Sequence, residues 1–349
     1  MSLSRTVPLV SLVCILTVTV LHASLNWHVQ LWRTDKAVPA VNRFRIGYLP
    51  VTCHLTCPVT DFINRSMTGE GIFEPVRFSG WPELKEAYLS NYTSATFILA
   101  PMAMALREQG VPLKIVYLGH RDGTALVVHK DSAIRRIEDL VGKTVAFPSR
   151  FSNQRLLLYK AFKDHNLDIK DLKMVEMPPP DMPAALYAHA VDGITSGEPF
   201  MAQAELEGYG RVLYLTRDVW PNFISCVLAV SDDVLRTRRP EVQELVNGIA
   251  RSGKWLDQKM DHRMDASQFV NKVYYHQDPR LLAFVLSKPP DRVTYSELSP
   301  LRHDFDEIYA LGVKSGILQG TIRFEDYVDP TLAGEAAGLP AYQWEAPKP

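Results

Sequence analysis

Short apolar runs alternate with amphipathic stretches along most of the chain from Arg43 onward. In the first part, strands are expected at residues 43–51, 74–80, 94–101 and 112–120. Helices are expected between them at residues 59–67, 81–91 and 102–110. Apolar runs bounded by Gly, Pro or Asn are typical of strands, and a helical period between them indicates crossover helices. The pattern therefore predicts an α/β protein with a mostly parallel sheet.

A second unit begins near Asp131 and repeats this alternation. Strands are expected at residues 143–148 and 173–178, with a short strand at 193–199, and helices at residues 153–167, 181–193 and 200–208. Two further strands, 124–130 and 223–230, flank this unit, so they are the natural places for the chain to enter and leave it. Ligands bind in open α/β sheets at the carboxyl ends of strands. We therefore expect two α/β lobes, a hinge of two crossing strands and one ligand cleft.

The corresponding domain boundaries follow from these positions. Lobe I is expected to be discontinuous, with residues 43–127 and 223–333. Lobe II, residues 128–222, is inserted in it, and residues 334–349 form a C-terminal tail.

The first residues differ from the rest of the chain. An apolar run from Val7 to Ala23 follows the single charge of Arg5, which is the layout of a secretory signal with a small residue at the cleavage point. The run also borders on the length of a spanning helix, so an uncleaved N-terminal anchor is the alternative for residues 1–23. Residues 24–42 are then expected to form a tether. Either reading predicts a periplasmic or other extracytoplasmic protein.

The bulk composition narrows the function. The chain has 349 residues, 46% of them hydrophobic and 22% charged, with a formal net charge of −1. A nucleic-acid-binding protein normally shows a basic patch, so no nucleic-acid partner is expected. The sequence contains no G-x-S-x-G, H-E-x-x-H, Walker or G-x-G-x-x-G motif. We therefore expect a binding protein without a cofactor rather than an enzyme.

The candidate ligand contacts all lie in loops that follow predicted strands. Such loops lead into helices whose first amide groups are unpaired, and these attract polar or anionic ligands. Trp81 begins a predicted helix, Gln154 and Arg155 open another, and Glu198 precedes Pro199 at the start of a third. For Trp81 a core position, for Arg155 a solvated surface charge, and for Glu198 a carboxylate that offsets the helix dipole remain open as alternatives.

A cluster of sulfur and imidazole side chains follows the first strand, in the stretch Thr52-Cys53-His54-Leu55-Thr56-Cys57. Three interpretations stay open. The cysteines pack as small hydrophobes or form a Cys53–Cys57 disulfide; the cluster contacts a small ligand; or Cys53, His54 and Cys57, with Cys226, bind a metal ion. A single C-x3-C with a distant cysteine is weak evidence for a metal site, so no metal residue is assigned.

Four longer stretches resemble the substrate-binding proteins of ABC importers, in the nitrate/sulfonate/taurine group and closest to its nitrate- and bicarbonate-binding branch. These are "GWPELKEAYLSNYTSATFILAPMAMAL", "LVGKTVAFP", "PPPDMPAALYAHAVDGITSGEPFMAQA" and "DVWPNFISCVLAVSDDVL". The resemblance implies a type II periplasmic binding protein fold. It also implies delivery of a small-molecule ligand by a monomer to an ABC permease in the membrane.

By that resemblance the ligand contacts are Trp81, Thr124, Gln154 and Glu198. The nitrate binders resemble "WPNxxxKVLA", whereas this chain has "WPNFISCVLA", so Cys226 stands where the family has a lysine. A charged donor makes hydrogen bonds roughly twice as strong as a neutral one, so its loss argues against nitrate itself. The complete set of expected ligand residues is Thr52, Cys53, His54, Trp81, Thr124, Gln154, Glu198 and Cys226. The expected ligand is a nitrate-like anion or another small nitrogen- or sulfur-containing solute, and a membrane-anchored ligand- or metal-sensing module is the alternative function.

Overall fold

The computed structural model describes residues 13–19 and 43–346. Residues 13–19 form an exposed helical segment, and the remainder of the expected signal or anchor and of the tether lies outside the described residues. None of the helices in the described part of the chain is both long and apolar enough to cross a membrane.

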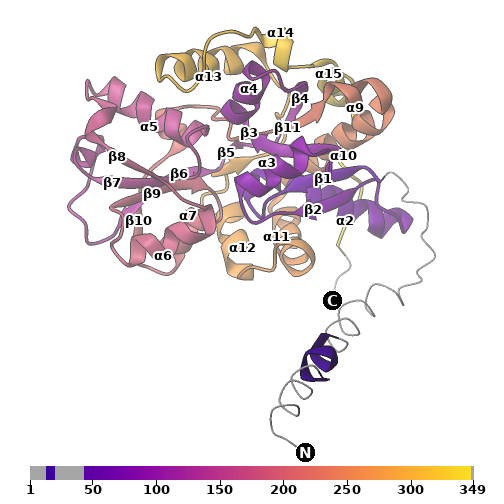
Figure 1. Ribbon diagram of the computed structural model, residues 1–349, viewed down its shortest axis with the longest axis horizontal. Coiled ribbons are helices and arrows are strands. Elements are labelled where there is room, and N and C mark those ends of the chain that lie inside the picture. The colour runs from indigo at the N-terminus through magenta and orange to yellow at the C-terminus, as the bar shows by residue number, and fades with distance from the viewer. Residues whose placement is uncertain (1–12, 20–42, 347–349) are drawn as a thin grey trace, which may run out of the picture. The chain divides into compact units, whose positions relative to one another are not determined.

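The first lobe is built on a five-stranded sheet with the strand order β2-β1-β3-β11-β4. Its strands are β1 (Arg45–Tyr48), β2 (Glu74–Arg77), β3 (Ala95–Leu99), β4 (Leu113–Leu118) and β11 (Cys226–Ser231). The helices between them are η1 (Thr52–His54), α2 (Thr56–Thr68), α3 (Trp81–Leu89) and α4 (Ala100–Glu108). The β-α-β reading of this part of the sequence is therefore confirmed (Figure 1).

The second lobe has its own five-stranded sheet, with the order β10-β6-β9-β7-β8. Its strands are β6 (Thr124–His129), β7 (Thr144–Phe147), β8 (Lys173–Glu176), β9 (Gly193–Gly197) and β10 (Gly210–Leu215). The helices of this lobe are η2 (Ile137–Leu140), α5 (Asn153–Asp164), η3 (Ile169–Asp171), η4 (Pro179–Asp181), α6 (Met182–Tyr187), α7 (Phe200–Leu206) and α8 (Thr216–Val219).

Each sheet contains one strand that runs against the others. In the first lobe β11 pairs antiparallel with both β3 and β4, and in the second lobe β6 pairs antiparallel with both β9 and β10. These two strands are the ones that the chain enters directly after passing from one sheet to the other. The sheets are thus mostly parallel, as predicted, and the exceptions mark the crossings.

The two crossings lie side by side. The short strand β5 (Arg121–Asp122) leads into the second lobe, and the backbone N–H of Asp122 donates to the carbonyl of Phe223 on the returning segment at 2.7 Å. A third segment, β12 (Val293–Thr294), pairs antiparallel with β5. The hinge expected from two strands is therefore reinforced by a third segment from the C-terminal part of the chain.

The remaining helices belong to the C-terminal part of the chain and are α9 (Asp232–Thr237), α10 (Arg239–Gln258), α11 (Met260–Val270), the π-helical η5 (Asn271–Tyr275), α12 (Pro279–Ser287), α13 (Arg302–Lys314), α14 (Phe324–Tyr327) and α15 (Thr331–Ala337). In α10 the buried residues Val242, Leu245, Val246 and Ile249 recur at helical spacing, which lets one face pack on the core. The segment named as a tail is packed rather than extended away from the fold, since Tyr342 is buried and the Trp344 carbonyl accepts a hydrogen bond from Trp255 Nε1 at 2.9 Å.

Candidate functional site

All eight expected ligand residues are buried and stand at the ends of strands or the beginnings of helices. Thr52, Cys53 and His54 form η1 directly after β1; Trp81 and Gln154 are the first and second residues of α3 and α5; Thr124 and Cys226 begin β6 and β11; Glu198 follows β9. The placement follows from the α/β pattern, because helices start where parallel strands end, and the antiparallel strands β6 and β11 begin at that same edge.

The start of α5 in the second lobe is bonded to the crossing segments. Gln154 Nε2 donates to Thr124 Oγ1 at 3.2 Å and to Ser225 Oγ at 3.0 Å. Asn153, its neighbour, donates through Nδ2 to the Ile224 carbonyl. One amide group thus links the strand that enters the second lobe to the segment that leaves it.

The η1 segment of the first lobe meets the second lobe through its backbone. The N–H of Thr52 donates to the carbonyl of Glu198 at 2.7 Å, and the carbonyl of Thr52 accepts from the Tyr295 hydroxyl at 3.0 Å. The Thr52 hydroxyl lies 3.2 Å from His120 Nε2. Burial lowers the pKa of His120 to about 3, so that this imidazole is neutral at pH 7.

His54 is held in one tautomer. The backbone N–H of Leu49 donates to its Nδ1 at 2.7 Å, so in the neutral ring the proton must lie on Nε2. Burial, with the nearby His120 as a smaller cause, lowers the pKa of His54 well below its usual value. The ring stands edge-on to Trp81 at a centroid distance of 5.6 Å and stacks on Phe97 at 5.0 Å. His54 therefore presents a neutral Nε2–H donor.

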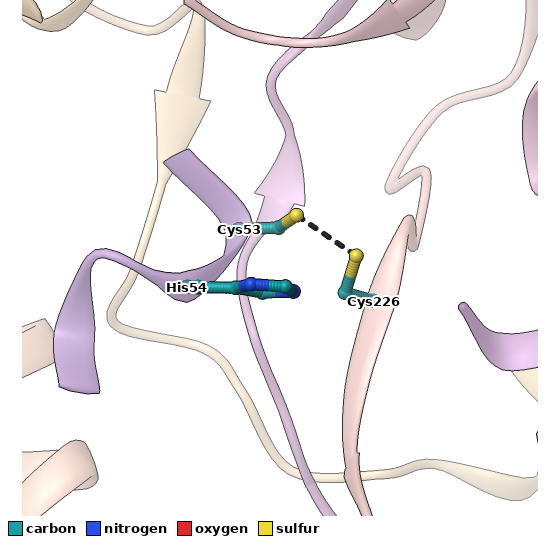
Figure 2. A group of neighbouring side chains, drawn as sticks. All are labelled: Cys53, His54 and Cys226. Carbon is teal, nitrogen blue, oxygen red and sulfur yellow. Dashed lines mark hydrogen bonds between the residues drawn. The ribbon is translucent and has the colours of Figure 1, made fainter. Parts of the chain in front are cut away.

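Cys53 and Cys226 face one another with their sulfur atoms 2.8 Å apart (Figure 2). These two sulfurs and one nitrogen of His54 lie within 4.8 Å of one another. Burial raises the pKa of the Cys53 thiol well above its usual value, which favours the thiol over the thiolate. The three buried cysteines Cys53, Cys57 and Cys226 are all unbridged in this structure, and Cys53 contacts Cys226 rather than Cys57.

The carboxylate of Glu198 is already occupied. Arg292 Nε donates to its Oε1 at 2.8 Å, and the backbone N–H of Ala202 donates to its Oε2 at 2.8 Å. The alternative in which Glu198 offsets the start of its helix therefore describes the observed contacts. Sequence reasoning missed Arg292, because it lies 94 positions away in a proline-rich loop with no recognisable motif.

Several buried polar atoms of residues near the crossings, His120 Nδ1 among them, have no hydrogen-bond partner in the described part of the chain. Two are donors from the first lobe, His54 Nε2 and Trp81 Nε1, and two are acceptors from the start of α5, Asn153 Oδ1 and Gln154 Oε1. Leaving such groups unpaired costs about 1–3 kcal/mol each. Of these residues, Trp81 also lines the groove beside α3 and α4.

A groove of about 460 Å³ opens beside Trp81 where the two lobes meet. Its walls come from α3 and α4 of the first lobe and from the residues around Arg150 and Phe151 of the second, with Lys85 and Glu176 among the charged groups. A larger hollow of about 800 Å³ lies along α11 beside Trp344, and none of the eight expected ligand residues lines it.

Two curated relatives match about half of this chain. The chain is 30% identical over 173 residues to a putative aliphatic sulfonates-binding protein of Escherichia coli, covering 48% of this chain and 53% of that protein. It is 24% identical over 186 residues to the nitrate import ATP-binding protein NrtC of Synechocystis, covering 49% of this chain and 28% of that protein. The chain thus spans about half or less of the length of these relatives.

Solved structures match over most of the chain. A ligand-binding component of an ABC-type import system from Staphylococcus aureus, with zinc bound, aligns with a TM-score of 0.75 and 26% identity over 84% of this chain and 98% of that one. The periplasmic nitrate-binding protein NrtA from Synechocystis aligns with a TM-score of 0.73 and 15% identity over 85% and 88%, a likeness of fold. The fold is therefore the two-lobed α/β fold of periplasmic binding proteins. The model of the NMT1-like family matches residues 37–271, and this chain belongs to that family.

Proposed function

We propose that this protein is an extracytoplasmic solute-binding protein that delivers a small polar ligand to an ABC importer. The observation that carries the proposal is the set of unpartnered buried atoms on His54, Trp81, Asn153 and Gln154, contributed by both lobes. Relatives named as sulfonate-binding and nitrate-import proteins support the same class of function. Ligand binding is enough to explain these groups, and it requires neither a nucleophile nor a general base, as turnover would.

The buried groups proposed to contact the ligand are neutral. Buried Arg292 is engaged by Glu198 and Glu205, and Arg121 is engaged by Asp304 at 2.8 Å. The unpartnered buried donors His54 Nε2 and Trp81 Nε1 are neutral, and the cations Lys85 and Arg150 line the groove beside Trp81. The nitrate binders that this chain resembles have a lysine at the position of Cys226. This chemistry favours an uncharged nitrogen- or sulfur-containing solute that carries both hydrogen-bond acceptors and donors over an anion such as nitrate.

Closure of the two lobes about the crossing segments would enclose the ligand. In this proposal the hinge is formed by residues near Thr124 and by the segment from Phe223, with lobe II inserted between them. Export as a monomer to the periplasm or another extracytoplasmic compartment completes the proposal. N-terminal sequencing of the mature protein separates a cleaved signal from a retained anchor.

A thiophilic metal ion is a second candidate ligand, because Cys53, His54 and Cys226 lie together and the Staphylococcus aureus structure is described with zinc bound. The tautomer of His54 weighs against it. Leu49 N–H occupies the lone pair of Nδ1, and Nε2 carries the proton, so the ring offers no free electron pair to a metal. Two sulfurs alone fall short of the four ligands typical of structural zinc.

The test is binding of defined solutes to the purified full chain. Calorimetry would compare sodium nitrate, sodium bicarbonate and short alkanesulfonates with zinc chloride. Trp81→Phe removes one donor and keeps an aromatic ring, so it should weaken binding of the preferred solute about tenfold, whereas Trp344→Phe makes the same change beside Phe62 and should leave binding unchanged. Equal binding by the two variants would contradict the proposed site.

A further inference from the structure

Two cysteines that are far apart in the sequence meet in the interior of the first lobe. Cys53 belongs to η1, Cys226 is the first residue of β11, and the two positions are separated by 173 residues. Both side chains are buried, at 1% and 0% exposure, and their sulfur atoms point at one another 2.8 Å apart (Figure 2). The Ser225 hydroxyl lies 3.7 Å from Cys226 Sγ, so the nearer neighbour of that sulfur is Cys53.

The backbone holds this pair in place. Gly119 lies between the two segments: its N–H donates to the Cys226 carbonyl at 2.9 Å, and a Cβ at this position would come within 2.1 Å of the Cys53 carbonyl oxygen. The Thr52 carbonyl accepts from Tyr295 on the other side. These contacts hold the backbone of Cys53 and the backbone of Cys226 close to each other.

Cys57 provides a comparison within the same stretch of chain. It is equally buried, in α2, but its titratable neighbours are Asp61 and the Tyr48, Tyr274 and Tyr275 hydroxyls rather than a second sulfur. Of the three buried cysteines, the structure thus pairs two and leaves Cys57 apart. This differs from the pairing that proximity in the sequence would favour.

We propose that Cys53 and Cys226 form a disulfide in the mature protein, directly beside the proposed ligand donors. A thiolate of one cysteine attacks the disulfide of an oxidising thiol–disulfide donor, forms a mixed disulfide and releases one thiol of that donor. The second cysteine then attacks the mixed disulfide, which forms the Cys53–Cys226 bond and releases the donor's second thiol. Two protons and two electrons pass to the donor overall.

Burial dictates when this reaction takes place. Both thiols are inaccessible in the folded state, so exchange with an external disulfide requires the segments to be open, as they are while the chain folds. An oxidising compartment, which the proposed export supplies, lets such a bond persist. The bond would close a loop that contains the entire second lobe, and longer loops gain more stability from a cross-link. It would also fix the segment that carries His54 against the strand that follows Ser225.

The bond is tested on purified full-length protein refolded in glutathione buffers of defined redox poise, so the outcome does not depend on where the protein resides. After unfolding in an alkylating agent, peptide mapping should join the Cys53 and Cys226 peptides and show Cys57 alkylated. Reduction should lower the melting temperature of the wild type and of Cys57→Ser by several degrees, and leave Cys53→Ser and Cys226→Ser unchanged.

Three results would overturn the proposal: alkylation of Cys53 in full yield after oxidative refolding, a Cys53–Cys57 linkage, or stoichiometric zinc retained on the two thiols. Should a serine variant fail to fold, the peptide map of the wild-type protein still decides. Failure of the solute-binding proposal would appear instead in calorimetry, with the disulfide map unaffected.

Discussion

Arg292 Nη2 and Glu198 Oε1 lie 2.5 Å apart, with both side chains almost completely buried, and this pair joins the segment after α12 to the start of α7 in the second lobe. Glu205 extends the contact through Arg292 Nη1 at 3.2 Å. The pair therefore connects the C-terminal part of the chain to the second lobe beside the crossings. Arg292 thus binds the Glu198 carboxylate, which the sequence analysis assigned to ligand contact.

Removing one partner of this pair should destabilise the protein strongly. Arg292→Met leaves the Glu198 carboxylate buried without its cation, and breaking a buried pair costs about 3–5 kcal/mol. Urea unfolding at pH 7 measures the loss. Arg280→Met removes an arginine that pairs with Asp278 with 77% of its side chain exposed, so that control should change stability by less than about 1 kcal/mol. If Arg292→Met lowered the free energy of unfolding as little as Arg280→Met, the buried pair would be unimportant for stability.

The strand and helix positions were predictable because their signals are local. Trp81-Pro82 marks a helix start, and the apolar runs at 94–101 and 223–230 correspond to buried strands in the structure. The partners of the candidate residues were not predictable in the same way. Cys53 with Cys226, and Glu198 with Arg292, depend on how distant loops meet after the lobes assemble. The tautomer of His54 depends on one backbone amide that has no side-chain signature.

Gln154 should contribute to stability as well as to ligand binding. Gln154→Leu removes the donor to both Thr124 Oγ1 and Ser225 Oγ, and the loss of such buried bonds costs about 1–3 kcal/mol. In thermal unfolding the variant should also lose most of the stabilisation that the preferred solute gives the wild type. Gln203→Leu, which removes a surface bond to Glu207, should remain within about 0.5 kcal/mol of the wild type and respond normally to the solute.

Asp122 should make the protein more stable in mild acid. Burial raises the pKa of Asp122 to about 6, opposed by the Phe223 amide, Arg217 and Arg121 and reinforced by Asp291. As the pH falls from 7 to 4, the folded state takes up a proton that the unfolded chain does not yet bind, so this group adds stability. The same stability is lost as the pH rises through about 6.

Asp122→Asn isolates this effect, because asparagine also tolerates the left-handed backbone at φ 62°. The variant should be more stable than the wild type at pH 7 by about 1–2 kcal/mol, after allowance for partial exposure, and the difference should vanish near pH 4. Urea midpoints at several pH values give the difference directly, which removes the contribution of other titrating groups such as His120. A difference that is constant from pH 4 to pH 7 would count against the raised pKa.

Gly119 should be the least replaceable glycine at the crossing. Gly119→Ala introduces a Cβ within 2.1 Å of the Cys53 carbonyl oxygen, and backbone atoms cannot move aside as a flexible side chain can. We expect a loss of at least about 2 kcal/mol in urea unfolding, because η1 or the crossing must shift. Gly334→Ala is the matched control: the residue lies in helix α15 with nothing within 4 Å of its Cβ position, so alanine should raise stability by up to about 1 kcal/mol. A loss of stability in Gly119→Ala together with a gain in Gly334→Ala would show that the cost comes from the contact with Cys53. A change of the same sign in both variants would refute that packing.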